Sequence, residues 1–159
     1  MAIDALLFDL DGTLIDSMPL HQKAWGRLHA RLGLPFDDAA FFAATAGRAN
    51  EEILVELVPQ ASAAERDAWS LSKEEDYRAL AAEELALIAG TLELKAAARA
   101  RGLRLAICTA APPANIAVAE RRFGLGGLVD TVACPADGLR RKPHPDIFLE
   151  AARRLGLAP

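Results

Sequence analysis

The chain has 159 residues, of which 52% are hydrophobic and 25% charged, and its formal net charge is -4. This length suits one globular domain of modest size, or a domain that carries an insertion. The acidic balance, with a pI near 5.4, provides no basic field, so we predict no nucleic-acid partner. Acidic residues from Asp4 and Asp9 onward interrupt the N-terminal apolar run, and no signal-peptide pattern precedes them, so we also expect no membrane association.

The first predicted element is a strand over residues 5–10, and acidic residues follow its apolar part at once. Side chains two positions apart in a strand point the same way, so we expect Asp9 and Asp11 to converge beyond its carboxyl end. Gly12 permits a sharp turn there, and Thr13 can hold that turn through side-chain hydrogen bonds. Converging carboxylates need a cation or a shared proton, and Mg²⁺ suits such oxygen ligands. The alternative is a turn that merely ends the strand.

The region over residues 17–87 predicts helices and no convincing strand, which indicates an inserted α-helical cap subdomain. Its first helix has an apolar stripe formed by Leu20, Ala24, Trp25, Leu28 and Leu32. We assign residues 1–16 and 88–159 to an α/β core and residues 17–87 to the cap. The cap helices are expected to cover the carboxyl edge of the core's sheet.

Helix boundaries within the cap region are predicted from its polar residues, prolines and glycines. Gly33 is expected to end the first helix, while Asn50 caps a later one that Pro59 ends. Ser62 and Glu65 have the spacing of a capping box at the start of a further helix.

Strands alternate with helices in the second half of the chain. Apolar runs over 103–108 and 128–134 predict strands buried on both faces. Helical patterns over 112–124 and 143–156 each open with proline and close at glycine. The predicted fold is therefore α/β, a Rossmann-like, doubly wound parallel sheet with right-handed crossovers.

The two cysteines, Cys108 and Cys134, lie in or beside these apolar runs. This placement favours reduced, buried thiols over a disulfide framework or a metal site. We therefore predict a reducing, cytoplasmic location.

The string "DLDGTL", residues 9–14, resembles the nucleophile motif of the haloacid dehalogenase superfamily of phosphohydrolases and phosphomutases. The resemblance implies that Asp9 attacks phosphorus and becomes an aspartyl phosphate, and that Asp11 is the general acid and base. It also implies that Asp9 and the carbonyl of Asp11 bind Mg²⁺. The superfamily's true dehalogenases lack the second aspartate, so Asp11 favours phosphoryl transfer.

Two later strings match the same superfamily. Thr109 in "LAICTAAPPAN" follows a strand as the family's serine or threonine does, which implies that its hydroxyl, with Ala110 beside it, binds a phosphoryl oxygen. Lys142 in "RRKPHPDIF" corresponds to the family lysine that neutralises charge on the phosphoryl group and the nucleophile. Taken alone, Thr109 would be a helix cap and Lys142 a solvated loop lysine.

Within the cap, His21, Gly47, Arg48 and Lys73 have spacings similar to those in β-phosphoglucomutase and related sugar phosphatases. The similarity implies that they select the substrate, with Arg48 binding its distal charge. For His21 and Lys73, a surface position on an amphipathic helix is an equal alternative.

The family pattern continues with a further strand and acidic residues that complete the magnesium site, and this sequence stops at Pro159, before them. In the family that strand pairs with the first strand. We therefore expect the strand at 5–10 to have an exposed edge, which self-association or another chain would cover. We also expect the chain to be a fragment of a longer phosphatase, with weak or no turnover alone.

The predicted function is a magnesium-dependent phosphohydrolase that acts on a small phosphorylated metabolite, with a sugar phosphate favoured, through an aspartyl phosphate. One alternative is a phosphomutase like β-phosphoglucomutase, which returns the phosphoryl group to the sugar. The other is a non-catalytic binding or regulatory domain that has kept the fold. The first two share every core residue, so only the cap and the products distinguish them.

Overall fold

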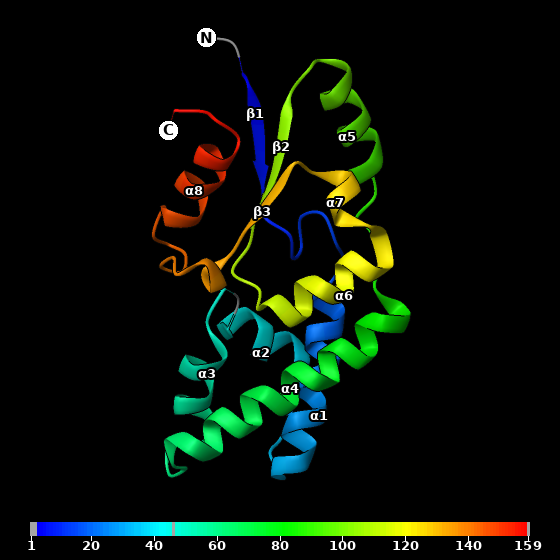
Figure 1. Cartoon of the computed structure of the whole chain (residues 1–159). Coiled ribbons are helices and arrows are strands. Elements are labelled where there is room, and N and C mark those ends of the chain that lie inside the picture. Colours follow the sequence, from blue (N-terminus) through cyan, green and yellow to red (C-terminus); the bar gives the residue numbers. More distant parts are fainter. Residues whose placement is uncertain (1–2, 46, 159) are drawn as a thin grey trace. The chain divides into compact units, whose positions relative to one another are not determined.

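The computed structural model describes residues 3–45 and 47–158 (Figure 1). Its backbone contacts divide the chain into two compact units. The first, here called the α/β unit, contains the residues up to 17 and from 85 onward. The second, the helical unit, contains residues 18–84. Each unit is described by itself below.

The α/β unit is built on a parallel sheet whose strands lie in the order β1-β2-β3. The strands are β1 (Ala5–Phe8), β2 (Arg104–Cys108) and β3 (Thr131–Ala133). Ala5 pairs with Arg104, and Cys108 pairs with Ala133. The predicted α/β class and parallel sheet are confirmed, but the strands are shorter than the apolar runs. The prediction that a strand starts at residue 128 is wrong, because Leu128 ends the helix α7 (Leu125–Leu128).

Helices cover both faces of this sheet (Figure 1). On one face, α8 (Asp146–Arg154) buries Ile147 and Ala151 against Ala106 and Cys108. On the other face lie α5 (Thr91–Ala100) and α7 (Leu125–Leu128), while α6 (Pro113–Phe123) and η1 (Pro135–Asp137) complete the unit. Successive strand residues face opposite sides, which explains why β2 is almost fully buried.

The predicted boundaries of α6 agree with the structure to within one residue, whereas α8 begins at Asp146 because residues 143–145 form a turn. α6 begins with proline in its first turn and ends at Gly124, whose φ is 62°. Gly156, with a φ of 69°, follows α8. Positive φ values favour glycine at these positions, since other residues pay a steric cost there.

The described part of the chain shows β1 paired with β2 and with no second strand, so β1 forms one edge of the sheet. The helix α8 nevertheless contacts β1, and Ala5 and Leu7 pack on its core. Whether a partner covers the edge of β1 stays a prediction.

The helical unit consists of α1 (Met18–Leu32), α2 (Asp38–Thr45), α3 (Asn50–Leu57) and α4 (Ala63–Glu84). Its core contains Trp25 and Leu28 from α1 and Ile53 and Leu54 from α3. The predicted apolar stripe of α1 is confirmed: four of its five residues are buried, and Leu32 packs against the core.

Two of the predicted caps in this unit have different outcomes. Ser62 and Glu65 form the expected capping box, with the Ser62 backbone N–H donating to Glu65 Oε2 at 2.8 Å. The prediction that Asn50 caps α3 is wrong, because Ala49 occupies the N-cap position and makes no side-chain bond there. The side chain of Asn50 instead bonds α4, as described below.

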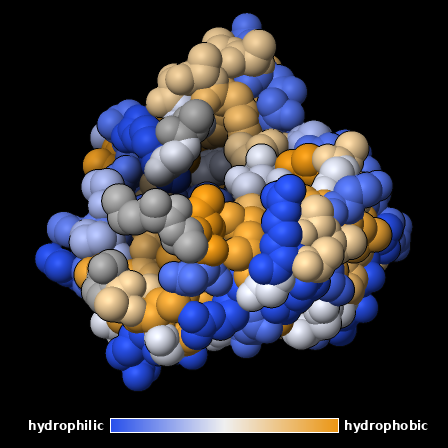
Figure 2. Space-filling view, turned by 90° about the horizontal axis from the view of Figure 1, so that it is seen from above, coloured by the Kyte–Doolittle hydropathy of each residue, from blue (hydrophilic) through white to orange (hydrophobic). Residues whose placement is uncertain are grey.

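The surface of the α/β unit mixes polar and apolar groups. Ile3, Leu92, Leu94 and Leu149 are its exposed large apolar side chains, and Figure 2 shows apolar areas bordered by hydrophilic residues. Among the described residues, the structure contains no helix that is both long enough and apolar enough to span a membrane.

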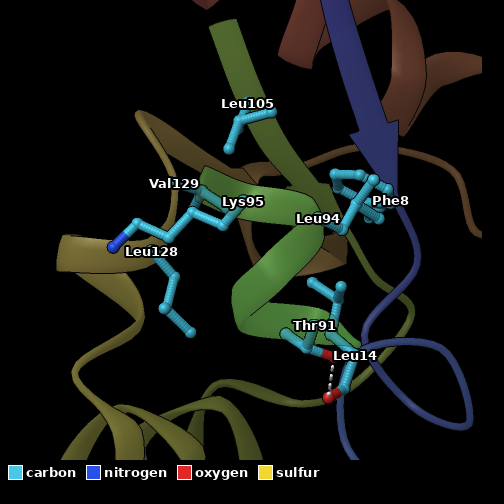
Figure 3. A pocket seen from close by; sticks show the side chains of 8 residues that line it. All are labelled: Phe8, Leu14, Thr91, Leu94, Lys95, Leu105, Leu128 and Val129. Carbon is cyan, nitrogen blue, oxygen red and sulfur yellow. Dashed lines mark hydrogen bonds between the residues drawn. The ribbon is translucent and has the colours of Figure 1, made fainter. Parts of the chain in front are cut away.

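A pocket of the α/β unit lies between α5, α7 and the sheet (Figure 3). Its lining is mainly apolar and includes Phe8, Leu105 and Leu128. Thr91 lies at its edge and donates a hydrogen bond from Oγ1 to the carbonyl of Leu14 at 3.1 Å. None of the predicted site residues lines this pocket, so it is separate from the candidate site.

Candidate active site

The first and third sequence motifs meet at an ion pair in the α/β unit. Lys142 Nζ lies 2.9 Å from Asp9 Oδ1, although the two residues are far apart in sequence. The same oxygen accepts the backbone N–H of Leu10 at 2.8 Å. Lys142 also lies 5.2 Å from the ring centroid of Phe148 on α8, which helps to fix its side chain. Asp9 Oδ1 thus has two donors, and Oδ2 accepts no hydrogen bond within the described part of the chain.

Asp9 and Asp11 lie beyond β1, in a turn rather than in the strand. Gly12 has a φ of 69°, as its predicted role in the turn requires. The carbonyl of Leu10 accepts backbone hydrogen bonds from Leu14 at 2.9 Å and Ile15 at 3.2 Å. This hydrogen-bond network fixes the backbone of the turn that carries both aspartates, and the convergence of their carboxylates stays a prediction.

A second pair of segments fixes the far end of this turn. Ile15 bridges Leu87 in an antiparallel manner, and the Asp16 N–H donates to the Ala86 carbonyl at 2.9 Å. The Ile88 N–H donates to the Leu14 carbonyl at 3.0 Å. The acidic turn is thus held between β1 and the segment that leads into α5.

The loop that carries Lys142 is anchored by the aspartate of its own motif. Arg140 donates from Nε to Asp146 Oδ2 at 2.8 Å and from Nη2 to Asp146 Oδ1 at 2.7 Å. These bonds hold the pKa of the Asp146 carboxyl below its usual value. Because Asp146 is the first residue of α8, the pair ties the loop to a helix that packs on the sheet.

Thr109 follows β2 directly and is buried. Its Oγ1 accepts the backbone N–H of Ala111 at 3.0 Å, and its own N–H donates to the Ala133 carbonyl at 3.1 Å. The hydroxyl hydrogen is left for another acceptor, such as a phosphoryl oxygen. Ala110 is exposed beside it. The alternative that Thr109 is a helix cap is wrong, because Pro112 is the N-cap of α6 and no side chain caps that helix. Thr109 instead holds the turn after β2 through the Ala111 N–H, and its role in phosphoryl binding stays a prediction.

The buried thiol of Cys108 lies close enough to the ion pair to sense both charges. Burial is the main cause that raises its pKa to about 11, while Lys142 lowers it and Asp9 raises it. The thiol is therefore protonated at neutral pH and inert as a metal ligand. Both cysteines are free and buried, as predicted.

The candidate site offers hard oxygen ligands for a metal ion. Residues 3–45 and 47–158 contain no group of three or more His, Cys, Asp or Glu side chains arranged around one metal position. Mg²⁺ commonly takes only one or two carboxylates and completes its six ligands with waters and substrate phosphate. Asp9 Oδ2 and the oxygens of Asp11 fit that limited protein contribution.

In the helical unit, the structure brings His21 and Lys73 together. Lys73 Nζ lies 2.8 Å from His21 Nδ1, and its side chain is only 3% exposed. The His21 ring stacks on Tyr77, with centroids 3.9 Å apart and planes 4° apart. The alternative that Lys73 is a solvated surface residue is therefore wrong.

Gly47 and Arg48 lie in the connection between α2 and α3. Gly47 has a φ of 78° and is exposed. Arg48 donates from Nη1 to Glu56 Oε2 at 2.9 Å and from Nη2 to Glu56 Oε1 at 2.5 Å. The Arg48 guanidinium holds the pKa of the Glu56 carboxyl below its usual value. A substrate anion would therefore compete with Glu56 for Arg48.

Sequence reasoning missed the polar residues that surround Lys73. Glu74 Oε1 accepts from Lys73 Nζ at 2.9 Å and from Asn50 Nδ2 at 2.7 Å. Asn50 Nδ2 also lies 3.2 Å from Ser70 Oγ. The sequence identifies Asn50 only as a possible helix cap, and no local pattern connects it with residues 20 and 24 positions away.

Comparisons with known proteins agree with the motifs. The model of the haloacid dehalogenase-like hydrolase family matches residues 3–159. The whole chain is 31% identical to protein CbbY of Rhodobacter capsulatus, of which it covers 74%. It is 32% identical to hexitol phosphatase A of Escherichia coli (strain K12), with 100% of this chain and 72% of the relative covered. The solved structure of β-phosphoglucomutase from Clostridium difficile has a TM-score of 0.80 at 25% identity, over 98% of this chain and 72% of that one.

The chain therefore belongs to the haloacid dehalogenase-like hydrolases. This membership confirms the resemblance inferred from "DLDGTL", "CTA" and "KPHPD". It also confirms the fold class, since the match extends over both units.

Proposed function

We propose that the chain is a phosphatase of phosphorylated carbohydrates in which Asp9 is the nucleophile. The ion pair between Lys142 and Asp9, with its 2.9 Å separation, is the observation that carries the proposal. This ion pair brings together two motifs that are far apart in the sequence and belong to different elements. The names of similar proteins, including hexitol phosphatase A and a fructose-1-phosphate phosphatase, support a carbohydrate substrate.

The proposed reaction proceeds in two displacements at phosphorus. Asp9 Oδ2 attacks the phosphorus atom, and the bond between phosphorus and the sugar oxygen breaks. Asp11 gives its proton to that oxygen, so the sugar leaves as an alcohol. Asp11 then removes a proton from water as the water oxygen attacks the aspartyl phosphate, which releases inorganic phosphate and restores Asp9.

The other core residues stabilise charge during these steps. Lys142 offsets the charge on Asp9 and on the phosphoryl group, so the two anions can approach each other. The Thr109 hydroxyl donates to a phosphoryl oxygen, with the Ala110 N–H as a neighbouring donor. Mg²⁺, held by Asp9 and Asp11, would supply further neutralisation of the phosphoryl charge when bound.

The helical unit supplies substrate recognition in this proposal. Lys73 and His21 form one polar pair, and Arg48 with Gly47 forms a separate group near α3. Neither group contains the carboxylate proposed to attack phosphorus, which suits binding of the sugar rather than bond breaking.

A phosphomutase is the second candidate, because the fold matches β-phosphoglucomutase with a TM-score of 0.80. Such an enzyme would form the same aspartyl phosphate and return the phosphoryl group to a sugar hydroxyl. The two candidates thus differ in their products and not in Asp9, Asp11, Thr109 or Lys142.

The deciding experiment incubates the protein with a panel of hexose, pentose and hexitol phosphates in the presence of Mg²⁺. Release of inorganic phosphate supports the phosphatase, whereas an isomerised sugar phosphate supports the mutase. Trapping of an acid-labile phosphoprotein, absent from Asp9→Asn, tests the intermediate that both share. Binding without a product or a phosphoprotein would instead support a non-catalytic domain. The expected weak turnover of the 159-residue chain stays a prediction that this assay measures.

A further inference from the structure

The apolar pocket of the α/β unit contains none of the candidate active-site residues (Figure 3). Phe8 and Leu105 line it from the sheet, and Leu128 and Val129 line it from the end of α7 and the residue after that helix. Its volume is about 280 Å³, including the mouth that opens to solvent. Pockets for drug-sized ligands hold about 300–1,000 Å³, so this space suits one aromatic ring or a short alkyl chain.

The helix α5 borders this pocket with an inward face that lacks large apolar side chains. Thr91, Lys95 and Ala98 share that face, because they are spaced by four and three positions. Thr91 and Ala98 are buried, and Lys95 is half-buried. The large side chains Leu92 and Leu94 are instead 52% and 44% exposed. A helix that packs on a core usually has apolar residues at its inward positions, so a lysine at position 95 needs a reason.

The side chain of Lys95 combines an apolar stem with a terminal charge. Figure 3 shows it extended from α5 towards α7, with its nitrogen at the end away from Phe8 and Leu14. The stem contributes to the lining of the pocket. Lysines beside apolar surfaces commonly bury their methylene groups in this way and keep the ammonium in water. The pocket therefore has an apolar interior and one cationic group at its mouth.

The Lys95 ammonium has no carboxylate partner within residues 3–45 and 47–158. Asp130 is the acidic residue that is adjacent in sequence to the pocket lining, and it is engaged elsewhere. Its Oδ2 accepts from Arg99 Nη1 at 2.8 Å and from the Leu105 N–H at 2.7 Å. The positive charge of Lys95 is thus left for an anion from solution.

We propose that this pocket binds a small monocarboxylate, whose single ring or short alkyl chain packs against Phe8 and Leu105 while its carboxylate contacts the Lys95 ammonium. Lysine acts as a point charge, so one ammonium matches a monoanion better than a phosphate dianion. A neutral apolar molecule would fill the same space and leave the ammonium without a counter-charge. The binding site is independent of the proposed phosphatase reaction.

The first test compares three probes on the wild-type protein. 3-Phenylpropionate has the ring and the carboxylate, 3-phenylpropan-1-ol has the ring alone, and acetate has the carboxylate alone. Titrations are followed in ¹H–¹³C spectra of protein labelled at leucine and valine methyl groups, with Leu128→Ile to assign one signal of the pocket.

We expect 3-phenylpropionate to bind with a Kd on the order of 1 mM and to shift the signals of Leu105, Leu128 and Val129. The alcohol should bind about fivefold more weakly, as the loss of one partly exposed ion pair predicts, and acetate should cause no shift there. Equal affinities of the acid and the alcohol, shifts confined to other residues, or no binding of the acid would overturn the proposal.

The second test compares Lys95→Met with Arg101→Met. Methionine keeps an apolar stem at position 95 and removes the charge, so the affinity for the acid should fall about fivefold, to that of the alcohol. The affinity for the alcohol should not change. Arg101 is exposed at the C-cap of α5 and does not line the pocket, so Arg101→Met should bind both probes as the wild type does. Unchanged binding of the acid by Lys95→Met would refute the role of Lys95.

A third variant, Lys95→Leu, tests the pocket itself. A leucine at this inward position should fill part of the space that the ring occupies, so binding of both the acid and the alcohol should be lost. Its thermal midpoint should be equal to that of the wild type or higher, because an apolar side chain replaces a charged one beside the core. Wild-type affinity for both probes would show that they bind elsewhere and would overturn the proposal. None of these measurements depends on phosphatase activity.

Discussion

Asp9 is the residue at which local and long-range contacts meet. The Leu10 N–H comes from the adjacent residue, whereas Lys142 comes from the loop before α8, and both contact Oδ1. This asymmetry leaves Oδ2 for phosphorus. The Lys142 ammonium beside Oδ1 also offsets the negative charge of the carboxylate as an anionic phosphoryl group approaches.

Replacement of Asp9 by asparagine should remove the nucleophile and retain the fold. The amide oxygen can still accept the Leu10 N–H, but the side chain cannot attack phosphorus. We expect kcat for phosphate release to fall by at least about 10⁴-fold, with a thermal midpoint near that of the wild type. Asp4→Asn, at an exposed position of the same unit, is the matched control. Substantial turnover by Asp9→Asn would contradict the assignment.

Replacement of Lys142 by methionine should separate charge stabilisation from nucleophilic attack. The variant keeps a side chain of similar length beside Phe148 but leaves Asp9 without its cation. We expect kcat to fall about 10²- to 10³-fold, in line with the loss of one preorganised electrostatic contact. Arg141→Met, an exposed neighbour on the same loop, should leave kcat near the wild-type value. Equal losses in both variants would indicate a general effect of the loop's charge.

At the scale of elements, α8 carries an acid-sensitive cluster that supports the site. Glu150 accepts bonds from Arg153 Nε and Arg154 Nε, each at 2.7 Å, and Arg154 also contacts Asp137 of η1 at 3.0 Å. The helix therefore links the end of β3 to the loop that holds Lys142.

The stability of α8 should depend on the ionisation of Glu150. The bonds from Arg153, then those from Arg154, lower the pKa of Glu150 from 4.5 to about 2. Since the unfolded chain binds this proton more readily, the contribution to stability is present above about pH 4.5 and is lost as pH falls towards about 2. In Glu150→Gln, the thermal midpoint should therefore decrease less than in the wild type as the pH is lowered over this range. Glu93→Gln on α5 is the control, and an unchanged acid profile of Glu150→Gln would contradict the prediction.

The contrast between α8 and α3 shows which features sequence reasoning could predict. The motif around Lys142 is contiguous, and its proline and aspartate positions indicate both a loop and the following helix. Asn50 also suits a helix start, yet its side chain bonds Ser70 and Glu74 on α4. Whether the Asn50 side chain caps α3 or bonds α4 depends on how the two helices pack, and the local sequence around Asn50 does not indicate that packing. The pairing of Lys142 with Asp9 was accessible only because both belong to family motifs.

At the scale of the whole molecule, each unit has its own core. Ile147 and Ala151 centre the core of the α/β unit, and Leu28 and Leu54 centre that of the helical unit. The residues that can report on unfolding, tryptophans by fluorescence and cysteines by thiol reactivity, are also divided between the two units. Both tryptophans, Trp25 and Trp69, belong to the helical unit. Both cysteines belong to the α/β unit and are buried.

This distribution allows the two cores to be followed separately during unfolding. Ile147→Ala and Leu28→Ala each remove a fully buried side chain, so each should cost about 2–5 kcal/mol of local stability. In urea titrations, Ile147→Ala should shift thiol reactivity more than tryptophan fluorescence, and Leu28→Ala should do the reverse. The wild type measured with both probes is the reference. If both probes shift together in both variants, the two units unfold as one cooperative body, and the prediction that each core has its own stability is wrong.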